Sequence, residues 1–250
     1  MNLYLLAAAA GEAAPESKFG FVEAMREGGP VAWSILAVMI IMSVGTFYIM
    51  FTKLFEQQKV LRQAKEVRMG FWRANSLEEG AAKLEKNSAF RQLVDDGINA
   101  QKSHSLLSDP VEAHDWLHGA MTSSEEAVNN KLASGLAFLA TVGATAPFVG
   151  LLGTVIGIYS ALIKIGIAGQ ADIGKIAGPV GEALIMTAVG LFVAVPAVLA
   201  YNWLQSRNKT IARALSAFST DVLGYITSGG KVRPAVAAAA KPAAPAAVKK

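Results

Sequence analysis

The feature that most constrains the fold is a run of 32 residues, from Leu132 to Ile163, without a single Asp, Glu, Lys, Arg or His. An α-helix rises about 1.5 Å per residue, so about 20 apolar residues already cross the roughly 30 Å hydrocarbon core of a bilayer. In that core every backbone N–H and C=O must be hydrogen-bonded, which favours a helix for a run of this kind. The run therefore predicts a transmembrane helix that is long enough to project beyond one face of the membrane.

Two further apolar segments predict two more membrane helices. Val31–Thr52 is a stretch of 22 residues without a charge, and residues 176–203 contain one ionisable side chain, that of Glu182. Tyr201 and Trp203 stand at the end of the last segment, and such aromatic side chains favour the membrane–water interface. We therefore expect an all-α, polytopic membrane protein with three transmembrane helices, long helices extending into the cytoplasm and a large first cytoplasmic loop.

The distribution of lysine and arginine predicts the orientation of these helices. Of the 23 Lys and Arg residues, 19 lie in residues 53–131 or from Arg207 onward. Positive charge gathers on the cytoplasmic side, so the N-terminus is expected in the periplasm and the C-terminus in the cytoplasm. The expected parts are an exported N-terminal segment (1–30), transmembrane helix 1 (31–52), a cytoplasmic helical loop domain (53–131), transmembrane helix 2 (132–163), a periplasmic link (164–175), transmembrane helix 3 (176–203), a cytoplasmic helix (204–228) and a disordered Ala/Pro/Lys tail (229–250). The apolar patch Leu3–Ala10 fits either a degenerate signal peptide or an exported tail.

The segments outside the membrane carry helix signals. Ser76 followed by Glu79 forms a capping box, and Asp109-Pro110 combines an N-cap residue with proline at the first helical position. From Asp109-Pro110 one helix is expected to run through Val128 directly into the second span. After the third span, apolar residues recur at alternating steps of four and three, which predicts a coiled-coil-like seam that ends at Gly229-Gly230. The seam residues are Ile211, Leu215, Phe218, Val222 and Tyr225.

Small residues form a stripe along one face of each of the last two spans. They follow one another at steps of three and four, which places them on a single helical face. Lipid is as apolar as leucine, so membrane helices associate where small residues let their backbones approach closely. Prolines inside such helices loosen them and free carbonyl groups. We expect the helix-packing residues to be Gly143, Gly150, Gly153, Gly157, Gly190, Pro147 and Pro196.

Three polar residues on the last two spans are the candidate site. Thr154 and Thr187 both lie about 15–18 Å below the outer boundary of the membrane, near its midplane. Glu182 lies roughly 10 Å below the same boundary, where a charged side chain costs about 2.5–3.5 kcal/mol. Together they favour a polar path for protons. The alternative is structural: each threonine hydroxyl bonds its own i−4 carbonyl, and Glu182 bonds a neighbouring helix.

Other kinds of chemistry find little support in the sequence. The chain has no cysteine, which excludes disulfides and thiolate chemistry, and no nucleophile–base pattern of an enzyme is visible. His114 and His118 have an i, i+4 spacing that zinc can use, but no third ligand is evident, and a solvated helix face is the favoured interpretation. Basic residues are not interleaved with aromatic ones, as nucleic-acid binding requires. We therefore expect no metal, no other cofactor and no nucleic acid.

Two motifs in the last two spans carry a resemblance to a known family. They are Gly-Ala-Thr-Ala-Pro-Phe-Val-Gly-Leu-Leu-Gly-Thr-Val-Ile-Gly-Ile (143–158) and Gly-Pro-Val-Gly-Glu-Ala-Leu-Ile-Met-Thr-Ala-Val-Gly-Leu (178–191). Together with residues 195–202 they resemble the ExbB/TolQ/MotA family, and the resemblance is strongest to its ExbB branch. It covers residues 132–202 closely and the rest of the chain through the three-span layout.

The resemblance implies a fold, a partner and a function. The family forms oligomers in the bacterial inner membrane, pentamers in the ExbB branch, with a central pore lined by spans two and three. An ExbD-type partner with a single span would enter that pore and carry the proton, and proton-motive force would be coupled through a TonB-type protein to siderophore and cobalamin import. Thr154 and Thr187 would be the pore threonines, and Glu182 the carboxylate of the third span. A TolQ-like role in the Tol-Pal envelope system is the alternative within the family, and a non-conducting scaffold for the partner is the alternative outside it.

Overall fold

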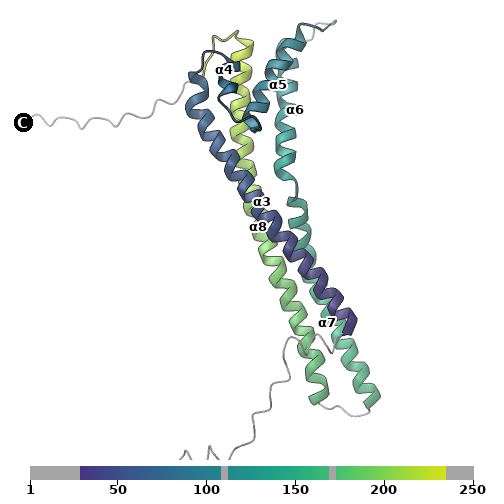
Figure 1. The fold of residues 1–250 in the computed structure, drawn as a ribbon. Coiled ribbons are helices and arrows are strands. Elements are labelled where there is room, and N and C mark those ends of the chain that lie inside the picture. The colour runs from purple at the N-terminus through teal and green to yellow at the C-terminus, as the bar shows by residue number, and fades with distance from the viewer. Residues whose placement is uncertain (1–28, 108–111, 169–172, 235–250) are drawn as a thin grey trace, which may run out of the picture. The chain divides into compact units, whose positions relative to one another are not determined.

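The computed structural model describes residues 29–107, 112–168 and 173–234, and within them all side chains except those of residues 168, 173–177 and 182. Every regular element in these ranges is a helix (Figure 1). Three helical stretches are long and apolar enough to cross a membrane. The expected all-α class with three spans is therefore confirmed. The elements are α3 (Gly29–Gly70), the 3-10 turn η1 (Phe71–Arg73), α4 (Leu77–Ala82), α5 (Ala89–His104), α6 (Ala113–Ala133), α7 (Leu136–Ala168) and α8 (Ile173–Thr227).

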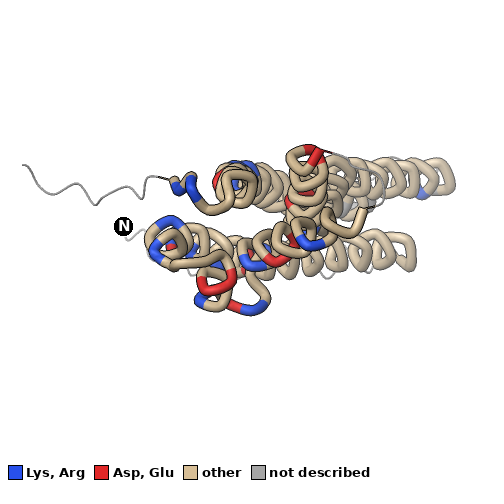
Figure 2. Tube along the Cα trace, turned by 90° about the horizontal axis from the view of Figure 1, so that it is seen from above, with Lys and Arg blue, Asp and Glu red and all other residues tan. Residues whose placement is uncertain are grey.

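The described residues divide into two compact units. The membrane unit consists of the described residues up to Tyr48 and of those in Phe138–Ala200, and it contains most of α7 and parts of α3 and α8. The loop unit consists of Ile49–Ala137 and the described residues from Tyr201 onward. Charged residues gather in the helices of the loop unit, whereas the helices of the membrane unit contain almost none (Figure 2).

The membrane unit has a core of small and flexible apolar side chains. Met39 of α3, Ala146 of α7 and Met186 of α8 are almost completely buried within one cluster. The outward faces are apolar as well: the side chains of Phe148 and Phe192 are 70% and 74% exposed. An exposed surface of this kind requires lipid or another protein surface as its environment.

The loop unit has its own core, built from the second half of α3, η1, α4, α5, α6 and the second half of α8. The first four seam residues of α8, from Ile211 to Val222, are at most 5% exposed, and Tyr225 packs against the same cluster. The predicted seam is thus confirmed. Phe71 and Phe90 make edge-to-face contacts with Phe218, at ring centroid distances of 5.0 and 5.5 Å.

Local signals fixed several helix ends as predicted. Ser76 accepts a hydrogen bond from the backbone N–H of Glu79 at 3.2 Å, and the carboxylate of Glu79 reaches back to the N–H of Asn75 at 3.0 Å. The N-cap role of Ser76 is therefore confirmed, while the return bond of Glu79 goes to Asn75 and not to the N-cap residue itself. The end of α8 is confirmed too, because Gly229 and Gly230 follow it with φ of 61° and 83°. The proposed helix start at 109–110 lies outside the described residues.

The prediction of one helix running directly into the second span was wrong. The helix breaks after Ala133, and α7 begins at Leu136. Gly135 has φ of 83°, a left-handed conformation that favours glycine and interrupts the helix.

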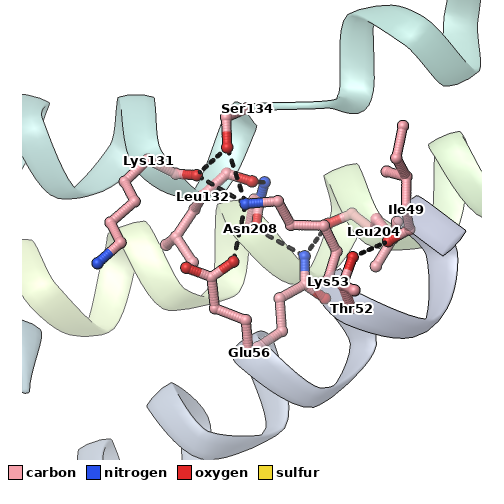
Figure 3. Close-up of polar contacts among 10 residues, drawn as sticks. Ile49, Thr52, Lys53, Glu56, Lys131, Leu132, Ser134, Leu204 and Asn208 are labelled. Atoms are coloured by element: carbon pink, nitrogen blue, oxygen red, sulfur yellow. Dashed lines mark hydrogen bonds and ion pairs between the residues drawn. The ribbon is translucent and has the colours of Figure 1, made fainter.

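Lys53 of α3 supports this break (Figure 3). Its Nζ donates to the carbonyl of Lys131 at 2.8 Å and to the hydroxyl of Ser134 at 2.9 Å, and it pairs with Glu56 at 2.7 Å. The last carbonyls of a helix have no intrahelical donor and carry partial negative charge, so a cation there stabilises the end of α6.

Candidate functional site

Two glycines bring α7 and α8 into backbone contact. A Cβ atom added at Gly150 would lie 2.7 Å from the carbonyl oxygen of Met186 and 3.2 Å from the Cα of Gly190. A Cβ added at Gly190 would lie 2.8 Å from the carbonyl oxygen of Ala146. Any residue larger than glycine would force the helices apart at these two points, because the obstacles are backbone atoms.

The other packing glycines face side chains rather than backbone. An added Cβ would lie 2.5 Å from the side chain of Val198 at Gly143, 2.9 Å from that of Met186 at Gly153, and 3.2 Å from that of Ala183 at Gly157. The two stripes of small residues therefore face each other within one chain. This arrangement leaves the larger side chains of α7 and α8 for the outward surface.

The glycine contact places two hydroxyl groups together. The hydroxyls of Thr154 and Thr187 are hydrogen-bonded to each other. The Thr154 hydroxyl also lies 3.2 Å from the carbonyl oxygen of Gly150, on its own helix, and 3.0 Å from that of Ala183, on α8. We call Thr154 and Thr187 the hydroxyl pair. It joins the two helices near the middle of their contact.

The hydroxyl pair has more acceptors around it than protons to share. Each hydroxyl carries one proton and two lone pairs, and a carbonyl can only accept. The Thr154 hydroxyl therefore donates to one partner at a time, and the pair can exchange one hydrogen-bonding pattern for another by rotation. Both side chains are half-buried, so each retains an open side. A hydroxyl relays hydrogen bonds but does not hold a charge near neutral pH, so a charge carrier must come from another group.

The surroundings of the hydroxyl pair are nearly free of charge. Among the side chains described in the membrane unit, Lys164 on α7 is the charged one, and it is exposed. A cavity of about 20 Å³ lies between α3, α7 and α8, with Gly157, Ser160 and Lys164 on its wall. A volume of 10–15 Å³ or more is enough to hold about one water molecule. The site thus has room for water one turn of α7 away from Thr154.

The structure describes the remaining candidate residues, two prolines and Glu182, only in part. Pro147 lies inside α7 and Pro196 inside α8, where each lacks the N–H that would bond the carbonyl four residues earlier. The side chain of Glu182 lies outside the described residues. Its backbone belongs to α8 and immediately precedes Ala183, whose carbonyl contacts Thr154. In the described part of the chain, no three His, Asp or Glu side chains gather as a metal site would require.

A buried polar cluster in the loop unit escaped the sequence reasoning. Gln57 of α3 is fully buried and donates to the carbonyl of Leu204 at 2.9 Å and to the side-chain oxygen of Asn208 at 2.7 Å. Asn208 in turn donates to the carbonyl of Leu132 at 3.0 Å. The available signal was spacing: Asn208 stands three residues before Ile211 and so continues the seam. A polar residue at a seam position fixes the register of its helix.

Comparisons with known proteins indicate which proteins this chain is similar to. Residues 85–217 match the MotA/TolQ/ExbB proton channel family. A protein named biopolymer transport protein ExbB from Xanthomonas campestris pv. campestris is 37% identical over 249 residues, covering 92% of this chain and 98% of the relative. An ExbB protein from Neisseria meningitidis is 34% identical over 201 residues, covering 78% and 91%. A Tol-Pal system protein TolQ from Haemophilus influenzae is 30% identical over 204 residues, covering 78% and 88%.

Proposed function

Because this chain belongs to the MotA/TolQ/ExbB proton channel family, we propose that it is an inner-membrane stator subunit that conducts protons and converts proton-motive force into mechanical work. Its partner in this proposal is an ExbD-type protein with a single span. The work is delivered through a TonB-type protein to outer-membrane transport of siderophores and cobalamin. The chain acts as a conducting subunit rather than as an enzyme.

The observation that carries the proposal is the hydroxyl pair. Thr154 and Thr187 are in contact where the backbones of α7 and α8 touch, in a unit whose described side chains include one charge, that of Lys164. Ionisable residues inside a membrane are expensive and mark ion or proton paths, and Glu182, five residues before Thr187 in α8, is such a residue. The half-buried hydroxyls offer hydrogen bonds to a proton carrier that passes along the open side of the pair.

The roles of the three polar residues follow from their chemistry. Thr154 and Thr187 supply donors and acceptors along the path, and Glu182, the carboxylate of the third span, accepts and releases the proton together with the carrier of the ExbD-type partner. Each elementary charge that moves through 100 mV releases about 2.3 kcal/mol, which is the source of the work.

The assembly follows from the apolar outer surface of the membrane unit. Side chains such as Phe148 and Phe192 are exposed in the single chain and need lipid or neighbouring copies around them. We infer a homo-oligomer, a pentamer by family resemblance, in which spans two and three enclose the partner. The N-terminus lies in the periplasm and the C-terminus in the cytoplasm, as the distribution of positive charge predicts.

The TolQ-like role is the second candidate. The identity to the ExbB relative is 37% over 92% of this chain, against 30% over 78% for the TolQ relative from Haemophilus influenzae, which favours the ExbB branch. Co-purification distinguishes the two: the ExbB reading expects an ExbD-type protein as the bound partner, and a Tol-type partner would support the other reading.

The experiment that tests the path measures proton flux in the reconstituted complex with its partner. Thr154→Val and Thr187→Val keep the shape of the side chain and remove the hydroxyl, and both are expected to reduce flux and transport while assembly is retained. Thr145→Val is the matched control, because Thr145 is exposed on the same helix and its hydroxyl bonds the i−4 carbonyl of Thr141 at 2.8 Å. Undiminished flux in both pair variants would reject the path.

The scaffold alternative makes a different prediction. If the chain only assembles the partner, Glu182→Gln preserves transport whenever the complex forms. The stator proposal expects a complex of normal composition with reduced transport. Measuring subunit composition and transport on the same preparation separates these outcomes.

A further inference from the structure

A cavity of about 460 Å³ opens in the loop unit between the second halves of α3 and α8. That volume lies in the range of typical ligand pockets, which is about 300–1,000 Å³. The wall is mostly apolar and includes the side chains of Val67, Trp72 and Phe218. Two charged residues also line it, Arg68 of α3 and Asp221 of α8. Arg68 is exposed to solvent, whereas Asp221 is half-buried, so the carboxylate is the charge that an occupant would meet inside the cavity. An occupant would therefore be a largely apolar segment with a positive charge in reach of Asp221.

The last residue of the chain that the structure describes lies at this cavity. Pro234, the last described residue, is part of the wall. The preceding residue, Arg233, is held by three contacts: its guanidinium donates to the carbonyls of Ala74 at 3.3 Å and Asn75 at 3.2 Å, and it lies 5.7 Å from the ring of Tyr225. These contacts hold the last described residues beside the cavity.

The segment that follows has the composition that the wall requires. Residues 235–250 consist of alanine, valine, proline and lysine, and they contain no acidic residue. Val236 comes two residues after Pro234, and Lys241 comes seven residues after it. Seven extended residues reach at most about 25 Å, which is more than twice the width of a compact cavity of this volume. Lys241 can therefore reach any part of the wall.

Asp221 gives the cavity a site for that lysine. Among the described residues it takes part in none of the ion pairs, and burial raises the pKa of its carboxyl above the usual value. A carboxylate that loses hydration without a cationic partner gains from one. We propose that residues 235–241 of the same chain dock into this cavity, with Val236 against the apolar wall and the Lys241 ammonium paired with Asp221.

Disulfide trapping tests the docking, and the chain is well suited to it because it contains no cysteine. The full-length double variant Ala217→Cys, Val236→Cys places one thiol on the cavity wall and one on the docked segment. Ser216→Cys with Val236→Cys is the control, because Ser216 is exposed beside Ala217 and is not part of the wall. A disulfide needs Cα atoms within about 7 Å, so we expect the first pair to form an intrachain bond at least about fivefold faster than the control.

Three results would overturn the proposal. One is equal rates for the two pairs. A second is the absence of a disulfide although both thiols react with a small maleimide. The third is a bond only between separately tagged chains, one carrying Ala217→Cys and the other Val236→Cys, which would assign the cavity to a second copy. Where Ala217→Cys fails to fold, Ala214→Cys on the same wall replaces it.

The ion pair between Lys241 and Asp221 is tested separately, in the Ala217→Cys, Val236→Cys double variant. Asp221→Asn and Lys241→Gln should each slow disulfide formation by up to about fivefold, the size expected of a partly exposed ion pair. Combining the two should slow it no further than either alone, because both remove the same interaction. Unchanged rates in both single variants would overturn the pairing of Lys241 with Asp221.

Discussion

Replacing Gly150 by alanine is the most direct perturbation of the site. The added Cβ would lie 2.7 Å from the carbonyl oxygen of Met186, whereas ordinary contacts begin at 3.4 Å. Relieving this contact requires a local separation of α7 and α8 by about 0.7 Å. Overpacking of this kind costs about 1–3 kcal/mol. Alanine regains up to about 1 kcal/mol through its higher helix propensity. The expected net loss is therefore about 1–2 kcal/mol.

The same displacement disturbs the hydroxyl pair. The Thr154 hydroxyl lies 3.0 Å from the carbonyl oxygen of Ala183. An added separation of about 0.7 Å would bring this distance beyond 3.6 Å, where the geometry no longer supports a hydrogen bond. Gly150→Ala is thus expected to reduce proton flux as well as stability, although it adds no polar group and removes none.

Thermal unfolding of the purified complex measures the stability loss, with flux measured on the same preparation. For a chain of this size, 1 kcal/mol shifts the midpoint by about 2–4 °C, so a decrease of about 2–8 °C is expected. Gly166→Ala is the matched control on α7, because a Cβ there meets no atom within 4 Å. If the two variants unfold at the same temperature and conduct equally, the helices are not in backbone contact and the reasoning fails.

Three further predictions concern the loop unit. Ser76→Ala removes the N-cap of α4 at a cost of about 0.5–2 kcal/mol, and hydrogen exchange of residues 77–82 should accelerate; unchanged protection would contradict the role of the cap. Gln57→Ala removes the donor to the side-chain oxygen of Asn208, at about 1–3 kcal/mol, and should lower the urea midpoint well below that of the exposed control Gln58→Ala; equal midpoints would refute it. The hydrogen bond from Lys59 lowers the pKa of Glu85, so the stability it adds is present above the ordinary pKa and is lost as pH falls through the lowered value. The stability difference between the parent chain and Glu85→Gln should therefore be present at pH 7 and vanish in acid, and a difference that persists in acid would exclude this pair as its cause.

The spans and the small-residue stripes could be predicted because they depend on local composition and period. The absence of charge between Leu132 and Ile163 predicts a membrane helix from the composition of the segment alone. The seam from Ile211 onward follows in the same way from its spacing. In these segments the residues that determine the structure lie within the segment itself, so the sequence alone is enough to predict it.

The break at Gly135 could not be predicted in this way. A single glycine inside an apolar run is compatible with a continuous helix, and the run has the right period on both sides. The break is supported by Lys53, which lies 81 residues from Ser134 in the chain and donates to its hydroxyl. A contact of that range depends on tertiary packing, which a pattern of neighbouring residues does not reveal.

The contact between the two threonines could be predicted only in part. The depth of each threonine in the membrane and the helix face on which it lies follow from the sequence. The helix face places Thr154 and Thr187 on the small-residue stripes. Their direct contact requires one register of α7 against α8, which the mutual contact of Gly150 and Gly190 provides. The sequence shows that both stripes exist, but it does not show that they meet within one chain.

Serine substitution distinguishes the two roles that a threonine in such a contact can have. Thr187→Ser keeps the hydroxyl and loses a methyl group, whereas Thr187→Val keeps the shape and loses the hydroxyl. If the hydroxyl pair is a path, serine should retain most of the proton flux and valine should lose it. If the threonine only fills space between α7 and α8, valine should be the better replacement, because serine leaves a small void and void formation is destabilising. Flux is measured at matched assembly, so that the order of the two variants reports on the path rather than on folding. The order serine above valine is expected, and the reverse order would assign Thr187 to packing.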